Sequence, residues 1–106
     1  MRRRIYKRDG WKCLCCGKNH DLSLDHCKPR DQGGSDQPSN LFTLCTTCNR
    51  FKANARNLSE WRHKLYEKFV AEGQPPEVAS LRARDIYYKA KNALRRKLPK
   101  LDREVA

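Results

Sequence analysis

The chain has 106 residues, 38% of them hydrophobic, and its mean hydropathy is −0.99. A chain this short forms one domain, or one domain with a helical appendage, and its thin apolar core is expected to need a cross-link. No stretch is apolar enough to cross a bilayer, and the polar Met-Arg-Arg-Arg start is unlike a secretory signal. We therefore expect a cytoplasmic, reducing location and no membrane partner.

The formal net charge is +12, from 24 Lys and Arg against 12 Asp and Glu. Residues 1–57 carry 12 basic and 5 acidic side chains, and residues 58–106 carry 12 and 7. Basic residues can simply solvate a surface, but binding a polyanion gains free energy from counterion release. A charge this large in so short a chain therefore favours a nucleic acid partner.

The first half of the chain predicts a strand, a loop, a second strand and a helix. Residues 22–26 alternate between apolar and polar side chains and predict a short strand. Residues 28–39 contain two prolines and a Gly-Gly pair, which predict a loop, and residues 41–44 predict the returning strand. A helix is expected from Cys45 to about Ala55, with threonines suited to its start.

The second half of the chain predicts a helical hairpin. The composition changes near Leu58, after which no cysteine occurs. Ser59 is expected to cap a helix that reaches about Glu72 and carries Trp61, Leu65 and Phe69 on one face. Gly73 and two prolines end that helix, and a second one begins at residue 76 or 77. Its apolar stripe runs to Leu98 and is expected to be core.

Six cysteines allow either a disulfide framework or a metal site. Two CxxC pairs stand about thirty residues apart, and in a reducing location such pairs usually bind metal. Four thiolates complete a closed tetrahedral shell, which suits structural zinc and leaves no position open for catalysis. The expected ligands are Cys13, Cys16, Cys45 and Cys48, with Gly17 supporting the first turn. Cys15 and Cys27 are expected to be spare thiols.

Asp25 and His26, at the end of the first predicted strand, are candidates for catalysis. An imidazole can accept a proton from water near neutral pH, and a carboxylate is a hard donor suited to Mg²⁺ or Mn²⁺. Hydrolysis of a phosphodiester needs both an activated water and neutralisation of charge on the phosphate. Because side chains alternate along a strand, a bulge or the strand end must let both residues reach one site.

The order of these elements resembles the HNH endonuclease family over about residues 5–57. The resemblance rests on Arg8-Asp9-Gly10, Cys13 to Gly17, Leu22 to His26, Gly33-Gly34, Asn40 to Cys45 and Cys48 to Lys52. It implies an α+β fold: a small ββα-metal, treble-clef-like, zinc-bound core over residues 1–57. A basic helical hairpin over residues 58–106 would follow this core and contact DNA or form a homodimer.

The resemblance also implies roles for individual residues. His26 would be the general base, and Asn40 would hold the loop and orient His26 by a hydrogen bond. Asp25 and Asn49 would bind the catalytic ion. Many family members have histidine at the last position, so this chain is an HNN variant, and its harder asparagine oxygen favours Mg²⁺ or Mn²⁺ over zinc. The expected DNA-phosphate contacts are Lys52, which shares a helix face with Asn49, together with Arg30 and Arg50.

Two functions remain open on this reading. The first is a metal-dependent endonuclease that cuts double-stranded DNA and leaves a 5′ phosphate and a 3′ hydroxyl. The alternative is a non-catalytic zinc-finger module that binds nucleic acid. Both need the four cysteines and the positive charge, but only the nuclease gives Asp25 and His26 a task.

Overall fold

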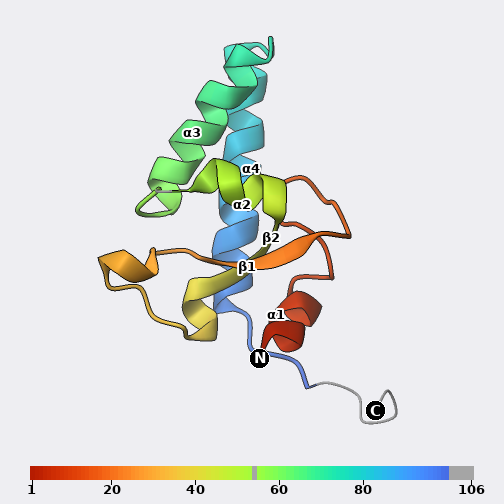
Figure 1. Ribbon diagram of the computed structural model, residues 1–106. Helices are drawn as coiled ribbons and strands as arrows, with labels where there is room; N and C mark the ends of the chain where they lie inside the picture. The colour runs from red at the N-terminus through yellow and green to blue at the C-terminus, as the bar shows by residue number, and fades with distance from the viewer. Residues whose placement is uncertain (54, 101–106) are drawn as a thin grey trace.

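The computed structural model describes residues 1–53 and 55–100. The chain forms a two-stranded sheet, helices on either side of it, and a helical hairpin at the C-terminal end (Figure 1). This confirms the expected α+β fold. The elements are α1 (Arg2–Arg8), β1 (Leu22–His26), η1 (Arg30–Gln32), η2 (Pro38–Asn40), β2 (Leu41–Cys45), α2 (Thr46–Lys52), α3 (Leu58–Ala71) and α4 (Pro76–Arg95). No helix in the described part of the chain is long and apolar enough to span a bilayer.

The two strands pair antiparallel in a regular register. Leu22 lies opposite Cys45, and His26 lies opposite Leu41, with every residue between them paired in turn. All five residues of β2 are buried, whereas those of β1 are half-buried. The strand that holds Asp25 and His26 is therefore straight through both residues, and its side chains alternate between two faces.

One apolar core joins the sheet to the helical hairpin. In Figure 1, α3 and α4 rise together above the sheet, and the lower half of α4 runs alongside it, where α4 contacts β2. Phe42 of β2 meets Trp61 of α3 edge-on, with ring centroids 5.5 Å apart. Ala83, Ala90 and Ala93 of α4 are buried in the same cluster. The change in composition near Leu58 is thus not a break in the core.

The structure differs from the local predictions in four places. Residues 2–8, for which no element was predicted, form α1. Helix α2 ends at Lys52 rather than near Ala55, because Ala53 takes a φ of 40°. Asn57, not Ser59, caps α3, because its side chain accepts the Glu60 backbone N–H at 2.9 Å.

The fourth difference concerns the end of α4. This helix stops at Arg95, before Leu98, and the next residue is extended. The following segment returns to α1, where Arg4 Nε donates to the Pro99 carbonyl at 3.0 Å and Lys7 Nζ donates to that of Lys100 at 2.7 Å. Leu98, the last residue of the expected apolar stripe, therefore lies outside α4, in the segment that returns to α1.

A buried ion pair ties α1 to β2. Arg8 Nε lies 2.7 Å from Asp9 Oδ1, and the two side chains are only 1% and 0% exposed. Arg8 also donates to the carbonyls of Pro38 and Leu41, at 2.9 and 2.6 Å. Asp9 Oδ2 accepts the backbone N–H and the hydroxyl of Thr43, at 2.9 and 2.8 Å. Both charges are paired and hydrogen-bonded, as a buried pair requires.

We predict that Asp9→Asn lowers the free energy of unfolding by about 3 kcal/mol, because it leaves the Arg8 charge buried without a counter-charge. Urea unfolding of the metal-loaded protein measures this. The matched control is Asp21→Asn, which removes an exposed pair with Lys18 at 3.2 Å and should cost about 1 kcal/mol or less. Equal losses of unfolding free energy in the two variants would show that the Arg8–Asp9 pair stabilises the fold no more than the exposed pair does.

Candidate functional site

Four cysteines converge where the segment after α1 meets the junction of β2 and α2. The sulfur atoms of Cys13, Cys16, Cys45 and Cys48 all lie within 4.8 Å of one another. The Cys16 and Cys45 sulfurs are 3.7 Å apart. Four sulfurs placed tetrahedrally around zinc are separated by about 3.8 Å, because each Zn–S bond is about 2.3 Å. The cluster therefore has the donor set and the size to hold a structural metal such as zinc.

The backbone around the cluster is arranged to support thiolates. The N–H of Cys16 points at the Cys13 sulfur at 3.5 Å, and the N–H of Cys48 points at the Cys45 sulfur at 3.4 Å. Gly17 makes the first turn possible through its left-handed φ of 82°. Its N–H donates to the Cys13 carbonyl at 2.9 Å. The Cys45 sulfur is thus both a candidate metal ligand and the N-cap acceptor of α2.

The pKa values of these thiols diverge. Burial raises the pKa of Cys45, but hydrogen bonds from Cys48, Cys16 and Cys13 outweigh it and lower the value to about 7. The pKa of Cys48 is raised by burial and by the charges of Cys15 and Cys13. Burial also raises the pKa of Cys13. Thiols packed this closely cannot all ionise without a cation, which is what a metal site requires.

The two remaining cysteines lie outside the set of four. Burial, followed by the nearby Cys13, raises the pKa of Cys15 to about 11. Burial also raises the pKa of Cys27. A thiol with a raised pKa is a poor nucleophile, so neither residue has the properties of a reactive cysteine.

Helix α2 lies against the face of β1 that carries Ser23 and Asp25. Asn49 Nδ2 donates to Ser23 Oγ at 3.0 Å, and Lys52 Nζ lies 2.9 Å from Asp25 Oδ2. Asn49 and Lys52 are three residues apart on the helix, and Ser23 and Asp25 are two apart on the strand, so the pairs are neighbours. The structure therefore brings Asp25 and Asn49 to one interface.

Lys52 differs from its expected role. Its side chain is 1% exposed, and besides approaching Asp25 it donates to the His26 carbonyl at 2.9 Å. The helix face shared with Asn49 points into the protein, because α2 packs on β1. Lys52 therefore faces Asp25 rather than a surface on which DNA could lie, and the expected phosphate contact is wrong. Arg30 and Arg50 are both exposed.

The Asp25 carboxylate has one oxygen whose hydrogen-bonding capacity is unused. Oδ2 is buried and lies at ion-pair distance from Lys52, but the direction of approach is not that of a hydrogen bond. Burial raises the pKa of Asp25, and the Lys52 ammonium opposes that rise. The Asn49 side chain donates from Nδ2 to Ser23, and its Oδ1 has no hydrogen bond within residues 1–53 and 55–100. The Asp25 carboxylate and the Asn49 amide supply oxygen donors of the kind that a hard divalent cation binds, and the Lys52 ammonium faces Asp25 Oδ2.

His26 lies on the opposite face of β1 from Asp25. No bulge turns the two side chains to one side, but His26 is the last residue of β1, the strand end that was the other expected means of reaching a shared site. The imidazole is 27% exposed. It borders a hollow of about 330 Å³ on the surface, lined by Met1, Arg2, Leu24, His26, Arg30, Asp36 and Leu41.

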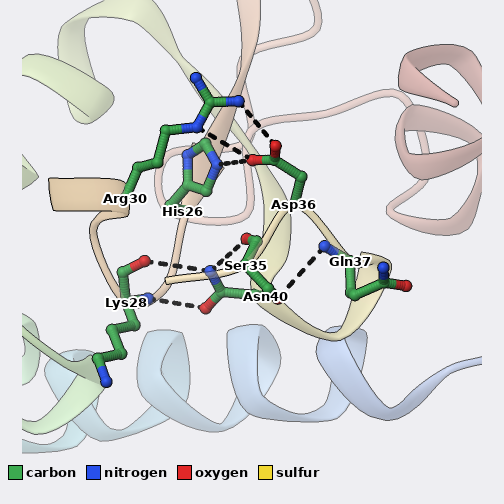
Figure 2. Close-up of polar contacts among 7 residues, drawn as sticks. All are labelled: His26, Lys28, Arg30, Ser35, Asp36, Gln37 and Asn40. Atoms are coloured by element: carbon green, nitrogen blue, oxygen red, sulfur yellow. Dashed lines mark hydrogen bonds and ion pairs between the residues drawn. The ribbon is translucent and has the colours of Figure 1, made fainter. Parts of the chain in front are cut away.

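Asn40 holds the loop between the strands, as Figure 2 shows. Its Oδ1 accepts the Lys28 N–H at 2.8 Å, and its Nδ2 donates to the carbonyls of Lys28 and Ser35 at 3.1 and 2.8 Å. These bonds occupy the amide, so the expected hydrogen bond to His26 is not formed. Gly34 completes the loop, because a Cβ there would lie 1.8 Å from the Lys28 carbonyl oxygen.

Asp36 contacts His26 in place of Asn40 (Figure 2). His26 Nε2 lies 2.8 Å from Asp36 Oδ1, and Arg30 Nη2 donates to Asp36 Oδ2 at 2.7 Å. The hydrogen bonds from Arg30 and then from His26 lower the pKa of Asp36 to about 2. Sequence reasoning gave Asp36 no role. Its partners lie six and ten residues earlier, in η1 and at the end of β1, a spacing that follows no helix or strand period.

Comparison with known proteins bears on the same region. Residues 13–55 match the family model described as HNH endonuclease. Searches of curated proteins and of solved structures each found no match. The matched segment includes both CxxC pairs, the two strands, the loop and α2, and it excludes α1 and the α3–α4 hairpin.

We predict that the purified chain holds one zinc ion, and that Cys16→Ser loses it and melts at a lower temperature, because three thiolates do not close the shell. Metal analysis and thermal unfolding measure the two effects. Cys15→Ser is the matched control, since the neighbouring thiol lies outside the cluster, and it should keep zinc. Loss of zinc in Cys15→Ser with retention in Cys16→Ser would overturn the ligand assignment.

Proposed function

Because residues 13–55 match the HNH endonuclease family model, we propose that this chain is a metal-dependent endonuclease that hydrolyses phosphodiester bonds in double-stranded DNA. The observation that carries the proposal is the pair of adjacent residues on β1. Asp25 is half-buried beside Lys52 of α2, Asn49 of the same helix donates to Ser23, and His26 borders a surface hollow beside Arg2 and Arg30. One strand thus carries a candidate metal ligand and a candidate general base.

Asp25 and Asn49 would hold the catalytic ion. Oxygen donors suit Mg²⁺ or Mn²⁺, and such an ion would neutralise charge on the scissile phosphate and on the leaving 3′ oxygen. Lys52 bears on this assignment, because its ammonium lies 2.9 Å from Asp25 Oδ2. That charge favours the ionised carboxylate, the form that binds a cation. Lys52 would thus stabilise the charged form of Asp25, the proposed metal ligand.

His26 would accept the proton of the attacking water, and the 3′ oxygen would leave, which produces a 5′ phosphate and a 3′ hydroxyl. Arg2 and Arg30 line the hollow beside the imidazole and would attract DNA phosphates. Arg50 is exposed on α2 and would add a further contact. Asn49 makes the chain an HNN variant of the family on this reading.

The rest of the chain would support DNA binding. Residues 58–106 carry 12 basic against 7 acidic side chains and would add to the attraction of DNA, consistent with the net charge of +12. A homodimer formed through this hairpin stays a prediction from the sequence. We propose the cytoplasm as the location, because a reducing compartment keeps the cysteines available to zinc.

A non-catalytic nucleic-acid-binding module is the competing candidate. It is favoured by one observation: Asp25 is paired with Lys52 and His26 with Asp36, so both side chains already have partners. A module of this kind needs the zinc site and the positive charge but neither the imidazole nor the carboxylate. Mutation of His26 therefore separates the two functions.

We predict that the zinc-loaded protein nicks or linearises supercoiled plasmid DNA when Mg²⁺ or Mn²⁺ is added. His26→Ala should lower the rate by at least about 100-fold, because general-base catalysis is lost, while zinc content and thermal stability are retained. His20→Ala, at an exposed loop histidine, is the control and should cut normally. Cleavage by His26→Ala at the parent rate would favour the non-catalytic module.

A further inference from the structure

The contact between His26 and Asp36 bears on which imidazole nitrogen could accept a proton. Asp36 Oδ1 lies 2.8 Å from Nε2 of His26. Hydrogen bonds from Arg30, then from His26, lower the pKa of the Asp36 carboxyl to about 2, so it is ionised at neutral pH. An ionised carboxylate only accepts hydrogen bonds. In a neutral imidazole facing it, Nε2 must therefore carry the hydrogen.

The other nitrogen is then free for chemistry. In a neutral imidazole one nitrogen donates and the other accepts, so a hydrogen on Nε2 leaves the lone pair on Nδ1. Among the residues that the structure describes, no hydrogen bond engages His26 Nδ1. The ring is also 27% exposed, so water can reach it.

The position of Asp36 is itself fixed by the loop. Arg30 reaches both carboxylate oxygens, with Nε 3.3 Å from Oδ1 and Nη2 2.7 Å from Oδ2. The neighbouring Ser35 is held by Asn40, which donates to its carbonyl at 2.8 Å, and the Gln37 N–H points at the Ser35 hydroxyl at 3.3 Å. Figure 2 shows the Asp36 carboxylate joined to both His26 and Arg30.

We propose that Asp36 is a positioning residue that holds His26 in the Nε2–H tautomer, so that Nδ1 accepts the proton of the attacking water. This rests on the proposed nuclease function. Water would lose one proton to Nδ1 while its oxygen bonds to phosphorus. The bond from phosphorus to the 3′ oxygen would break with its electron pair, and that oxygen would take a proton from solvent.

The tautomer can be measured without DNA. In zinc-loaded protein labelled with ¹⁵N-histidine, long-range ¹H–¹⁵N spectra distinguish a protonated from an unprotonated ring nitrogen. The parent should show hydrogen on Nε2 of His26. Asp36→Asn should shift His26 toward the Nδ1–H tautomer, because Arg30 retains the amide oxygen and the amide nitrogen is left facing Nε2. Asp31→Asn, a neighbouring exposed carboxylate on η1, should change nothing.

Cleavage provides the second readout. Asp36→Asn should lower kcat by at least about tenfold without raising KM, because removing a negative charge cannot weaken the attraction of DNA. Asp36→Glu should recover part of the loss, since it restores the carboxylate. Asp31→Asn should match the parent.

Three results would overturn the proposal. His26 could hold the same tautomer in the parent and in Asp36→Asn, or Asp36→Asn could cut at the parent rate. Faster cleavage by Asp36→Asn would instead show that the carboxylate blocks the site. In each case a parent that cuts DNA leaves the nuclease function standing. A parent that cuts no DNA would refute both the nuclease function and the role of Asp36 in it, whichever tautomer is seen.

Discussion

The convergence of four cysteine sulfur atoms constrains how the strands and α2 pack in the core. It joins the segment that holds Cys13 and Cys16 to the junction of β2 and α2, in a chain whose apolar core is small. Cys45 has two functions there, because its sulfur also caps α2. One atom of the cluster that could hold a metal thus also sets where α2 begins. That start determines which face of the helix, with Asn49 and Lys52, lies on β1.

The straight geometry of β1 divides the proposed chemistry between two faces. Asp25 lies against α2, where the Lys52 ammonium compensates the cost of burying a carboxylate. His26 lies on the other face, where a loop stabilised by Asn40 brings Asp36 to the imidazole. Asp25 and His26 can therefore take separate roles on opposite faces of β1. For both to act on one phosphate, the phosphate has to span the edge of the strand between them.

Local spacing predicted much of this arrangement. The CxxC pairs, the alternation over residues 22–26 and the Gly33-Gly34 loop each specify structure within a few residues, and the structure contains all of them. Beyond the helix ends and caps, the failures are pairings between separate segments: Arg8–Asp9 with β2, Lys52 with Asp25, and Asp36 with His26. A lysine after a helical turn looks like a surface cation in the sequence. Only the packing of α2 on β1 shows that it is buried.

The most direct test of the account is to locate the divalent ion on the zinc-loaded protein. Mn²⁺ is paramagnetic and broadens the NMR signals of nearby nuclei, so a titration followed by amide spectra maps its site. If Asp25 and Asn49 bind the ion, broadening is centred on residues 23–26 and 49–52, and signals at the tip of the α3–α4 hairpin are unchanged. Broadening centred elsewhere, or none at millimolar Mn²⁺, would contradict the assignment of Asp25 and Asn49 as ligands.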